Sequence, residues 1–368
     1  MAKFSDTQPF LQFGGKIDPL SEIRNVGILT TGNVVWVKHP SDADYLTVKE
    51  DVGNENLFDT IQKAIDSPQV RNGKNDYVVV CPRDNNSAWS ESNSTAIVQL
   101  NKDNVHLVAL GAGQSFGSAS AILELPGTAG TIGTFGAIYV TGDGCEVGGF
   151  FVRGTAGTSA GGSLGAGTVD GEMLGGFITV GTTVQGLDLH DFRAHRAGAA
   201  QWDGGTTGLA GTPKAAIMLG SGCQNITIRD GYIDCGTQSK DLMGLSLPFN
   251  GQNIKVSDTV FVQRGLAAAS KHIVAGAGTI PVGIHLNAQR VTFVNTSGTT
   301  MSSAFGGTMA VGAFALVNEC PTFRATESGT PGSTLVTPLL GVGTITTGGV
   351  RNPYIATGTA AVIPAGGA

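Results

Sequence analysis

Aspartates that follow short apolar strands in the middle of the chain are the residues whose type and spacing suit catalysis. Asp188, Asp191 and Asp230 lie in the segments "LDLHDFRA" and "ITIRDGYID". Enzymes that hydrolyse glycosidic bonds use two carboxyl groups, about 5 Å apart when they retain configuration and about 6.5–9.5 Å apart when they invert it. Neighbouring strands of a sheet are about 4.8 Å apart, so acids on two adjacent strands satisfy this requirement. These three aspartates are therefore the candidate catalytic residues if the chain is an enzyme.

The strand pattern also gives these aspartates a structural interpretation, which we favour. Period-2 alternation predicts an outward row of residues on successive strands that reads Asp188, Thr227, Lys255 and Thr292. This row holds a single acid, with no second acid beside it. The aspartates that directly follow their strands, where Asp commonly caps a turn, are Asp191, Asp230 and Asp258. We therefore expect no catalytic site and no enzyme activity.

Two further motifs do not indicate a site. His190 and His195 in "HDFRAH" are five residues apart, which on one strand places them on opposite faces. A metal centre needs three or four convergent ligands. "GQSFG" at 113–117 matches the serine-hydrolase pattern G-x-S-x-G, but "SASAILELPG" after it does not predict the helix of a nucleophile elbow. We expect no metal site and no cofactor.

The composition excludes several classes of protein. Glycine makes up 56 of 368 residues, charged residues are 14%, and the formal net charge is −6. The sequence has no basic cluster of the kind that binds nucleic acid, and no apolar run of the about 18 residues that cross a membrane. "MAKFSDTQPF" lacks the hydrophobic region of a secretion signal. The five scattered cysteines never form CxxC, so we expect them to be buried and reduced, as in a cytosol.

A loose repeat from residue 105 onward indicates a solenoid. Each copy has a short strand, a Gly/Asn turn and a second alternating strand, as in "AAIMLGSGCQNITIRDGYID". Matching positions, spaced by 39, 40, 28 and 39 residues, are Ile138, Phe177, Ile217, Leu245 and Ile284. Periods of about 20–50 residues are typical of solenoids and propellers, and the signals of a propeller blade are missing. We predict a parallel β-helix with inward apolar columns formed by Ile226 and Ile228, Ile254 and Val256, and Val291 and Phe293.

A short amphipathic helix is expected near 57–66, ahead of the repeat. The apolar residues that fall on one face of this helix are Leu57, Phe58, Ile61, Ala64 and Ile65. Asn54 and Asn56 offer capping oxygens before it. The first coil of a solenoid exposes strand edges and an open apolar end, which must be covered. We therefore predict that this helix caps the first coil.

The layout of residues 34–111 resembles the opening of right-handed parallel β-helix proteins of the pectate-lyase and tailspike type. The matching parts are "LFDTIQKAID", a loop with Asp76, "YVVVCP" and "VHLVALGAG". Arg83 stands where that superfamily has glycine after the proline, so we expect a rebuilt first turn. The resemblance implies an all-β, single-stranded right-handed parallel β-helix with a short N-terminal capping α-helix. We divide the chain into an N-terminal arm at 1–40, the β-helix at 41–320 and a C-terminal extension at 321–368.

The N-terminal arm and the Gly/Ala/Thr-rich, charge-poor body resemble structural proteins of tailed bacteriophage particles, and capsid decoration (cement) proteins most closely. This resemblance implies a virion protein, assembled in the host cytoplasm, that stabilises the shell. Its partners would be the major capsid protein and its own copies in a homotrimer. Candidate anchoring residues, which dock either on a partner or on the chain's own body, are Phe4, Phe10 and Phe13.

The alternative is a tailspike or tail-fibre protein that binds or cleaves host surface polysaccharide. Cleavage would use the three candidate aspartates named above. Binding without cleavage would need exposed aromatic side chains along one flank, and the candidates are Trp89, Trp202 and Tyr232.

Overall fold

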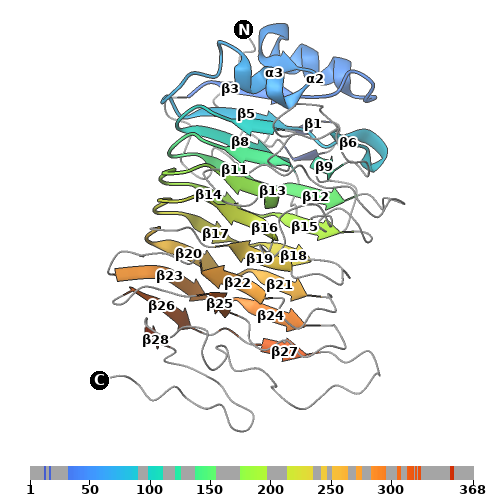
Figure 1. The fold of residues 1–368 in the computed structure, drawn as a ribbon. Helices are drawn as coiled ribbons and strands as arrows, with labels where there is room; N and C mark the ends of the chain where they lie inside the picture. Colours follow the sequence, from blue (N-terminus) through green and yellow to red (C-terminus); the bar gives the residue numbers. More distant parts are fainter. Residues whose placement is uncertain are drawn as a thin grey trace, which may run out of the picture.

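The chain consists mainly of parallel β-strands, with few and short helices (Figure 1). The all-β prediction is therefore confirmed at this level. The residues that the computed structural model describes are 12–13, 16–17, 32–89, 98–110, 121–125, 137–154, 175–196, 214–234, 242–246, 251–263, 271–275, 283–295, 305–307, 313–318, 320, 322–324 and 349–351.

The parallel strands form sheets of eleven, eight and seven strands. The eleven-stranded sheet contains, in spatial order, β4 (Leu57–Phe58), β3 (Val34–Val37), β5 (Asp76–Val80), β8 (Val105–Ala109), β11 (Glu146–Gly148), β14 (Asp188–His190), β17 (Thr227–Arg229), β20 (Ile254–Ser257), β23 (Gly283–Gln289), β26 (Ala313–Asn318) and β28 (Gly349–Arg351). The eight-stranded sheet contains β6 (Ala88–Trp89), β9 (Ala121–Leu125), β12 (Phe150–Gly154), β15 (Arg193–Arg196), β18 (Tyr232–Asp234), β21 (Val260–Gln263), β24 (Thr292–Asn295) and β27 (Thr322–Arg324). The seven-stranded sheet contains β7 (Val98–Leu100), β10 (Ile138–Val140), β13 (Gly175–Val180), β16 (Lys214–Leu219), β19 (Leu242–Ser246), β22 (Lys271–Ala275) and β25 (Phe305–Gly307).

From β7 to β27 the chain visits the three sheets in a fixed order, and each strand up to β24 pairs with the strand three positions later. We call three consecutive strands, one from each sheet, a rung; β10, β11 and β12 form one. In Figure 1 the rungs follow one another from the blue, helix-bearing end to the red C-terminal end. A separate antiparallel pair is formed by β1 (Gln12–Phe13) and β2 (Lys16–Ile17).

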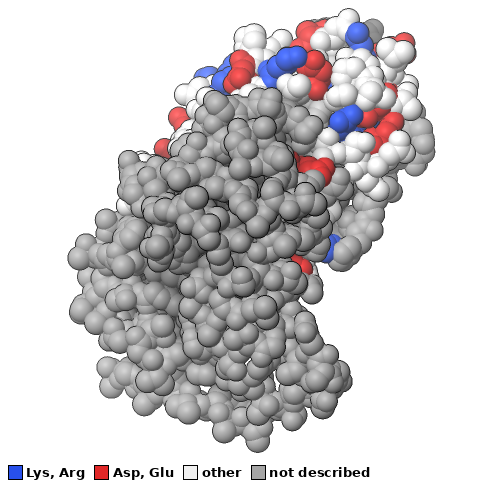
Figure 2. Space-filling model, turned by 45° about the vertical axis from the view of Figure 1, so that its right-hand side comes forward, with Lys and Arg blue, Asp and Glu red and all other residues white. Residues whose placement is uncertain are grey.

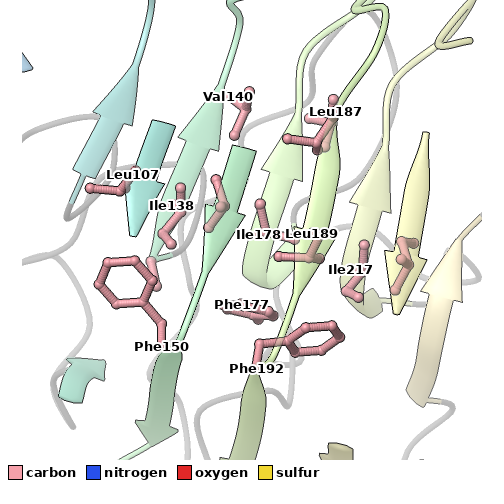
Figure 3. Close-up of a cluster of buried hydrophobic side chains, with 14 of the residues drawn as sticks. Leu107, Ile138, Val140, Phe150, Phe177, Ile178, Leu187, Leu189, Phe192 and Ile217 are labelled. Atoms are coloured by element: carbon pink, nitrogen blue, oxygen red, sulfur yellow. The ribbon is translucent and has the colours of Figure 1, made fainter. Parts of the chain in front are cut away.

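One apolar core is shared by the three sheets. Inward side chains of the eleven-stranded sheet pair in register, and the fully buried column they form is Val78, Leu107, Val147, Leu189, Ile228, Val256 and Ala288. Figure 3 shows Leu107 of β8, Ile138 of β10 and Phe150 of β12, together with Phe192 just before β15, around the same interior. Fully burying each large apolar side chain stabilises the fold by about 1.5–3 kcal/mol, so the stacked columns supply most of the driving force.

The six residues predicted to point inward are all confirmed as buried, Val291 included, but the last pair does not continue the column of the first two. Ile226, Ile228, Ile254 and Val256 are all fully buried. Phe293 is buried too, but it pairs with Phe261 in the eight-stranded sheet, and the residue that continues the Val256 column is Ala288. The apolar pattern alone does not say which sheet a strand joins.

The predicted repeat alignment is wrong at two positions. Ile138 pairs with Ile178 rather than with Phe177. Leu245 pairs with Ile273 of β22, a strand that the sequence reading missed, whereas Ile284 lies on β23 of the eleven-stranded sheet. Unequal segments between the strands shift the spacing, so a fixed period assigns some strands to the wrong sheet.

The predicted capping helix is present but shorter than expected. Helix α3 (Ile61–Asp66) packs its fully buried Ile61, Ala64 and Ile65 into the shared core at the N-terminal end (Figure 1). Its N-cap is Thr60, whose side chain accepts a hydrogen bond from the Lys63 amide at 3.3 Å. The prediction that Asn54 and Asn56 cap the helix is wrong, because they form a 3₁₀ turn, η1 (Asn54–Asn56), and the residues after it form β4.

Helix α2 (Tyr45–Val52) was not predicted, and it covers the outer face of the first strands. A second apolar cluster there contains Trp36, Tyr77 and Val79, with Tyr45 and Val48 of α2 packed against it. Strands β3 and β5 thus have apolar residues on both faces of the sheet. Helix α2 covers the outer face, and helix α3 packs into the core on the inner face. Short helices that cover strand faces leave little amphipathic signal in the sequence.

Arg83 lies in the turn that follows β5 and leads to β6. This turn contains η2 (Asp84–Asn86). The Arg83 guanidinium donates to the Ala88 carbonyl at 3.0 Å and to the Ser41 hydroxyl at 3.1 Å, and it lies 5.7 Å from the centre of the Trp89 ring. The turn is therefore stabilised by the arginine side chain rather than by the freedom of a glycine.

Side chains link successive rungs at the turns that lead into the eleven-stranded sheet. Asn72 Oδ1 accepts from the Asp103 amide at 2.6 Å, and Asp103 Oδ1 accepts from the Asp143 amide at 2.9 Å. Asp143 Oδ1 in turn accepts from the Gln185 amide at 2.8 Å. Each acceptor satisfies a backbone N–H of the next rung, so these hydrogen bonds stabilise the contact between neighbouring rungs.

Candidate functional site

The outer face of the eleven-stranded sheet brings the candidate carboxylates together with residues that the sequence reading did not select. Asp188 pairs in register with Glu146 on one side and with Thr227 on the other. The prediction that Asp188 has no acid beside it is therefore wrong. The row continues from Lys255 to Asn287, not to Thr292, which belongs to the eight-stranded sheet.

The candidate residues Asp191 and Asp230 lie one position beyond strands β14 and β17. Both have left-handed backbones, with φ of 49° and 52°, and Asp258 occupies the same position after β20 with φ of 49°. The turn position that we predicted for the three aspartates is confirmed. Aspartate tolerates this conformation better than most residues because its short side chain bonds locally.

Glu146 is the centre of a hydrogen-bonded cluster that spans β8, β11 and β14. Its Oε2 lies 2.7 Å from His106 Nδ1, and its Oε1 lies 2.7 Å from His190 Nε2. The other ring nitrogen of His190, Nδ1, lies 2.8 Å from Asp191 Oδ2. Carboxylates only accept hydrogen bonds, so both nitrogens of His190 carry protons and the ring is an imidazolium. We call His106, Glu146, His190 and Asp191 the histidine–carboxylate cluster.

The cluster shifts the acidity of its members. Burial alone raises the pKa of Glu146, but hydrogen bonds from His106 and His190, with their charges, lower that pKa to about 2. Burial alone lowers the pKa of His190, but the hydrogen bonds to Asp191 and Glu146 outweigh it and raise the pKa to about 9. The hydrogen bond from His190 is the main cause that lowers the pKa of Asp191. At neutral pH the cluster therefore holds two carboxylates and a charged His190.

A glycine makes this geometry possible. Gly148 pairs with His190 across the two strands, and an ideal Cβ on Gly148 would lie 2.5 Å from His190 Cε1 and 2.7 Å from Nε2. Real Cβ contacts are never this short, so any side chain at 148 would displace the imidazole. Gly148 therefore lets the ring lie flat over the neighbouring strand and reach Glu146.

The remaining candidate acids are paired with arginine. Arg229 Nε and Nη2 donate to the two oxygens of Asp188 at 3.2 and 2.9 Å, and its Nη1 donates to Asp230 at 3.2 Å. Arg290 makes the equivalent two-bond contact with Asp258, at 2.7 and 2.6 Å. The Arg229–Asp188 and Arg290–Asp258 pairs each join adjacent strands or turns in a bidentate geometry, whereas Arg229 makes a single bond to its sequence neighbour Asp230.

Tyr77 and His106 extend the row toward the N-terminal end. Their rings stack at 4.3 Å, and Tyr77 is almost fully buried, which together with the charge of Glu146 raises its pKa to about 12. Within the described residues, the Tyr77 hydroxyl and His106 Nε2 have no hydrogen-bond partner. Both atoms are also shielded from solvent, so His106 Nε2 cannot act as a base on a substrate in this conformation.

The arrangement does not suit acid–base chemistry. A glycosidase needs one carboxyl group that keeps its proton near neutral pH, so its pKa must be raised. Glu146 has the opposite shift, and Asp188 holds Arg229 with both of its oxygens. His195 lies on β15, a different strand from His190, so the premise that both lie on one strand is wrong. In the part of the chain that the structure describes, no group of three or more His, Cys, Asp or Glu side chains is placed to hold a metal ion.

The structure describes some of the remaining residues that the sequence singled out, and not others. Phe4, Phe10 and Trp202 lie outside the described residues, and Phe13 is described only as part of β1. Trp89 is buried, and the Arg193 guanidinium lies 4.8 Å from the centre of the Tyr232 ring, so neither forms an open aromatic platform. The cysteines that the structure describes, Cys81, Cys145, Cys223 and Cys320, are buried, as expected. No helix among the described residues has the length and apolar character needed to cross a membrane.

Comparison with known proteins gives no match: no protein-family model, curated protein or solved structure is similar to the chain. The resemblances drawn from the sequence, and the division into arm, body and extension, therefore stay predictions.

Proposed function

We propose that the chain is a single-stranded right-handed parallel β-helix and that it serves as a structural protein of a phage particle, as a capsid decoration protein. The observation that carries the structural role is the pairing of the outward acids. Glu146, Asp188, Asp191, Asp230 and Asp258 are each hydrogen-bonded to a histidine or an arginine, so every acid on the face most suited to a carboxylate enzyme already has a partner among the chain's own residues.

The same contacts support a rigid, load-resisting rod. They join side chains across β8, β11, β14 and β17, in parallel with the backbone ladders between those strands. The turn acceptors Asp103 and Asp143 add further bonds from rung to rung. A solenoid's stability depends on the interfaces between neighbouring repeats, and this chain reinforces them inside, outside and at the turns.

The assignment to a phage shell is based on the sequence resemblance. Figure 2 shows acidic and basic residues intermixed on the described surface near the helix-bearing end, with no broad patch of either sign. Such a surface does not favour nucleic acid. The proposed partners are the major capsid protein and further copies of this chain in a homotrimer, with Phe4, Phe10 and Phe13 of the arm as anchors.

A tailspike that cleaves polysaccharide is the second candidate, favoured by one observation. Glu146 and Asp188 are neighbours in register, and adjacent strands place two carboxylates within the range used by glycosidases. The contacts of both acids weigh against it, because Glu146 is hydrogen-bonded to His106 and His190 and Asp188 holds Arg229 with both of its oxygens.

Co-assembly with shells tests the structural proposal. Shells assembled from the major capsid protein that is the proposed partner are mixed with the purified protein and sedimented, and the temperature at which they break is measured. We expect co-sedimentation in a fixed ratio and a higher breaking temperature. A variant that lacks residues 1–31 tests the anchoring role of the arm. Failure to bind shells, together with release of oligosaccharides from host polysaccharide that is lost in Glu146→Gln and Asp188→Asn, would instead establish the enzyme.

A further inference from the structure

His190 is the side chain on which the outer face of β11 and β14 depends most. Both ring nitrogens are bonded to carboxylates, Nε2 to Glu146 on the preceding rung and Nδ1 to Asp191 at the turn. The ring is mostly buried, and it lies against the bare backbone of Gly148. A neutral imidazole has only one N–H, so it can donate to one of these carboxylates but not to both.

We propose that protonated His190 is a pH-dependent link between the rungs of β11 and β14, and that loss of its proton in alkaline solution releases the outer face of β14. A neutral ring turns a nitrogen lone pair toward a buried or half-buried carboxylate. The two repel each other, and the ring must leave its position over Gly148 or give up one contact. The link is therefore complete only while the imidazolium persists.

The charged groups around His190 favour the proton on balance. Glu146 faces it from β11, and Asp191 faces it from the turn. Asp188 lies two residues earlier on the same strand, where it holds Arg229. Arg229, next to His190 in register on β17, opposes the proton, and His106 reaches the cluster only through the other oxygen of Glu146. The two direct contacts are both carboxylates, so they outweigh the more distant arginine, whose charge is shared with Asp188 and Asp230.

The His190 link should weaken as the pH rises. The folded chain holds the His190 proton more tightly than the unfolded chain does, because the two carboxylates are positioned only in the fold. The link is therefore fully formed at pH 6.5, where both carboxylates are ionised, and is lost as the pH rises through about 9. The expected change is local, since the backbone ladders of the rung do not titrate.

The first experiment follows the ring itself. The His190 Cε1–H resonance of the full chain, assigned by its absence in His190→Gln, is titrated by NMR from pH 5 to 10.5. We expect a midpoint well above that of an unperturbed histidine. A midpoint near 6.5 would overturn the proposal, and this result does not require any variant to be as stable as the native chain.

The second experiment measures how strongly the strands β11 and β14 are held together. Hydrogen-exchange protection factors, which remove the intrinsic effect of pH, are compared at pH 6.5 and 9.5 for amides of β11 and β14. We expect the native chain to lose at least about tenfold protection between the two pH values, and His190→Gln to be weakly protected at both. Arg290→Gln is the matched control: it removes an inter-rung pair that does not titrate here, so its effect near β23 should be equal at both pH values.

Equal protection of native β14 at both pH values, or a pH-dependent loss that persists in His190→Gln, would contradict the link. The test does not depend on where the protein is located, so it is separate from the proposed shell function.

Discussion

Replacement of Gly148 by alanine tests how the outer face is built. The new Cβ would lie 2.5 Å from His190 Cε1, so the imidazole must rotate away from Glu146 and Asp191. Two charge-assisted hydrogen bonds are lost, each worth about 1.5–3 kcal/mol. The lower figure applies because Glu146 keeps His106 and Asp191 is half-exposed. Alanine in a strand recovers about 0.5–1 kcal/mol over glycine, which leaves a net loss of about 2 kcal/mol.

Hydrogen exchange of β11 and β14 measures this loss directly, because strands that pair only with their neighbours in the stack can open locally rather than as a whole. A loss of about 2 kcal/mol is a fall of about 30-fold in protection. The control is a double-mutant cycle: in a His190→Ala background, Gly148→Ala should cost nothing or stabilise slightly, since no ring remains to displace. An unchanged single variant, or an equal cost in both backgrounds, would refute the reasoning.

Three further predictions follow from burial, capping and titration. The free energy of unfolding should fall by about 3 kcal/mol as the pH rises from 6.5 to about 9, at about 1.36 kcal/mol per pKa unit of His190. It should also fall on the acid side, as Glu146 is protonated between pH 4.5 and about 2. Thermal melts across this range measure both effects, and a melting temperature that stays constant above pH 6.5 would contradict the raised pKa of His190. Leu189→Ala, at a fully buried position of the inward column, should cost about 2–5 kcal/mol in urea denaturation, whereas Thr227→Ala on the outer face of the next strand should cost much less. Thr60→Ala should cost about 1 kcal/mol by removing the N-cap of α3, with the loss of exchange protection confined to that helix; loss spread over later rungs would show that α3 stabilises more than the first coil.

The inner face of the fold was largely predictable from the sequence. Alternation of β-branched and polar residues identifies Ile226, Ile228, Ile254 and Val256 as inward, because a one-residue slip would turn the whole set outward. The same pattern cannot assign a strand to a sheet. Phe293 and Ile284 were misplaced because the segments between strands vary in length and apolar alternation is alike in all three sheets.

The candidate site was only partly predictable, because it depends on register between distant segments. Asp188, Asp191 and Asp230 were found as acids at strand ends. Glu146 was missed, since "CEVGG" shows neither a partner nor a strong strand pattern, and its contact with His190 spans 44 residues of sequence. The signal that was available is Gly148, a glycine inside a strand, which indicates close approach by a neighbouring group.

Location of the protein in a density map of the intact phage particle tests the central claim most directly. The account predicts density for a three-sheeted parallel rod on the outer surface of the shell, in contact with the major capsid protein and repeated with the shell symmetry. Density for the chain only at the tail, or a particle that lacks the protein altogether, would contradict the proposal of a capsid decoration protein.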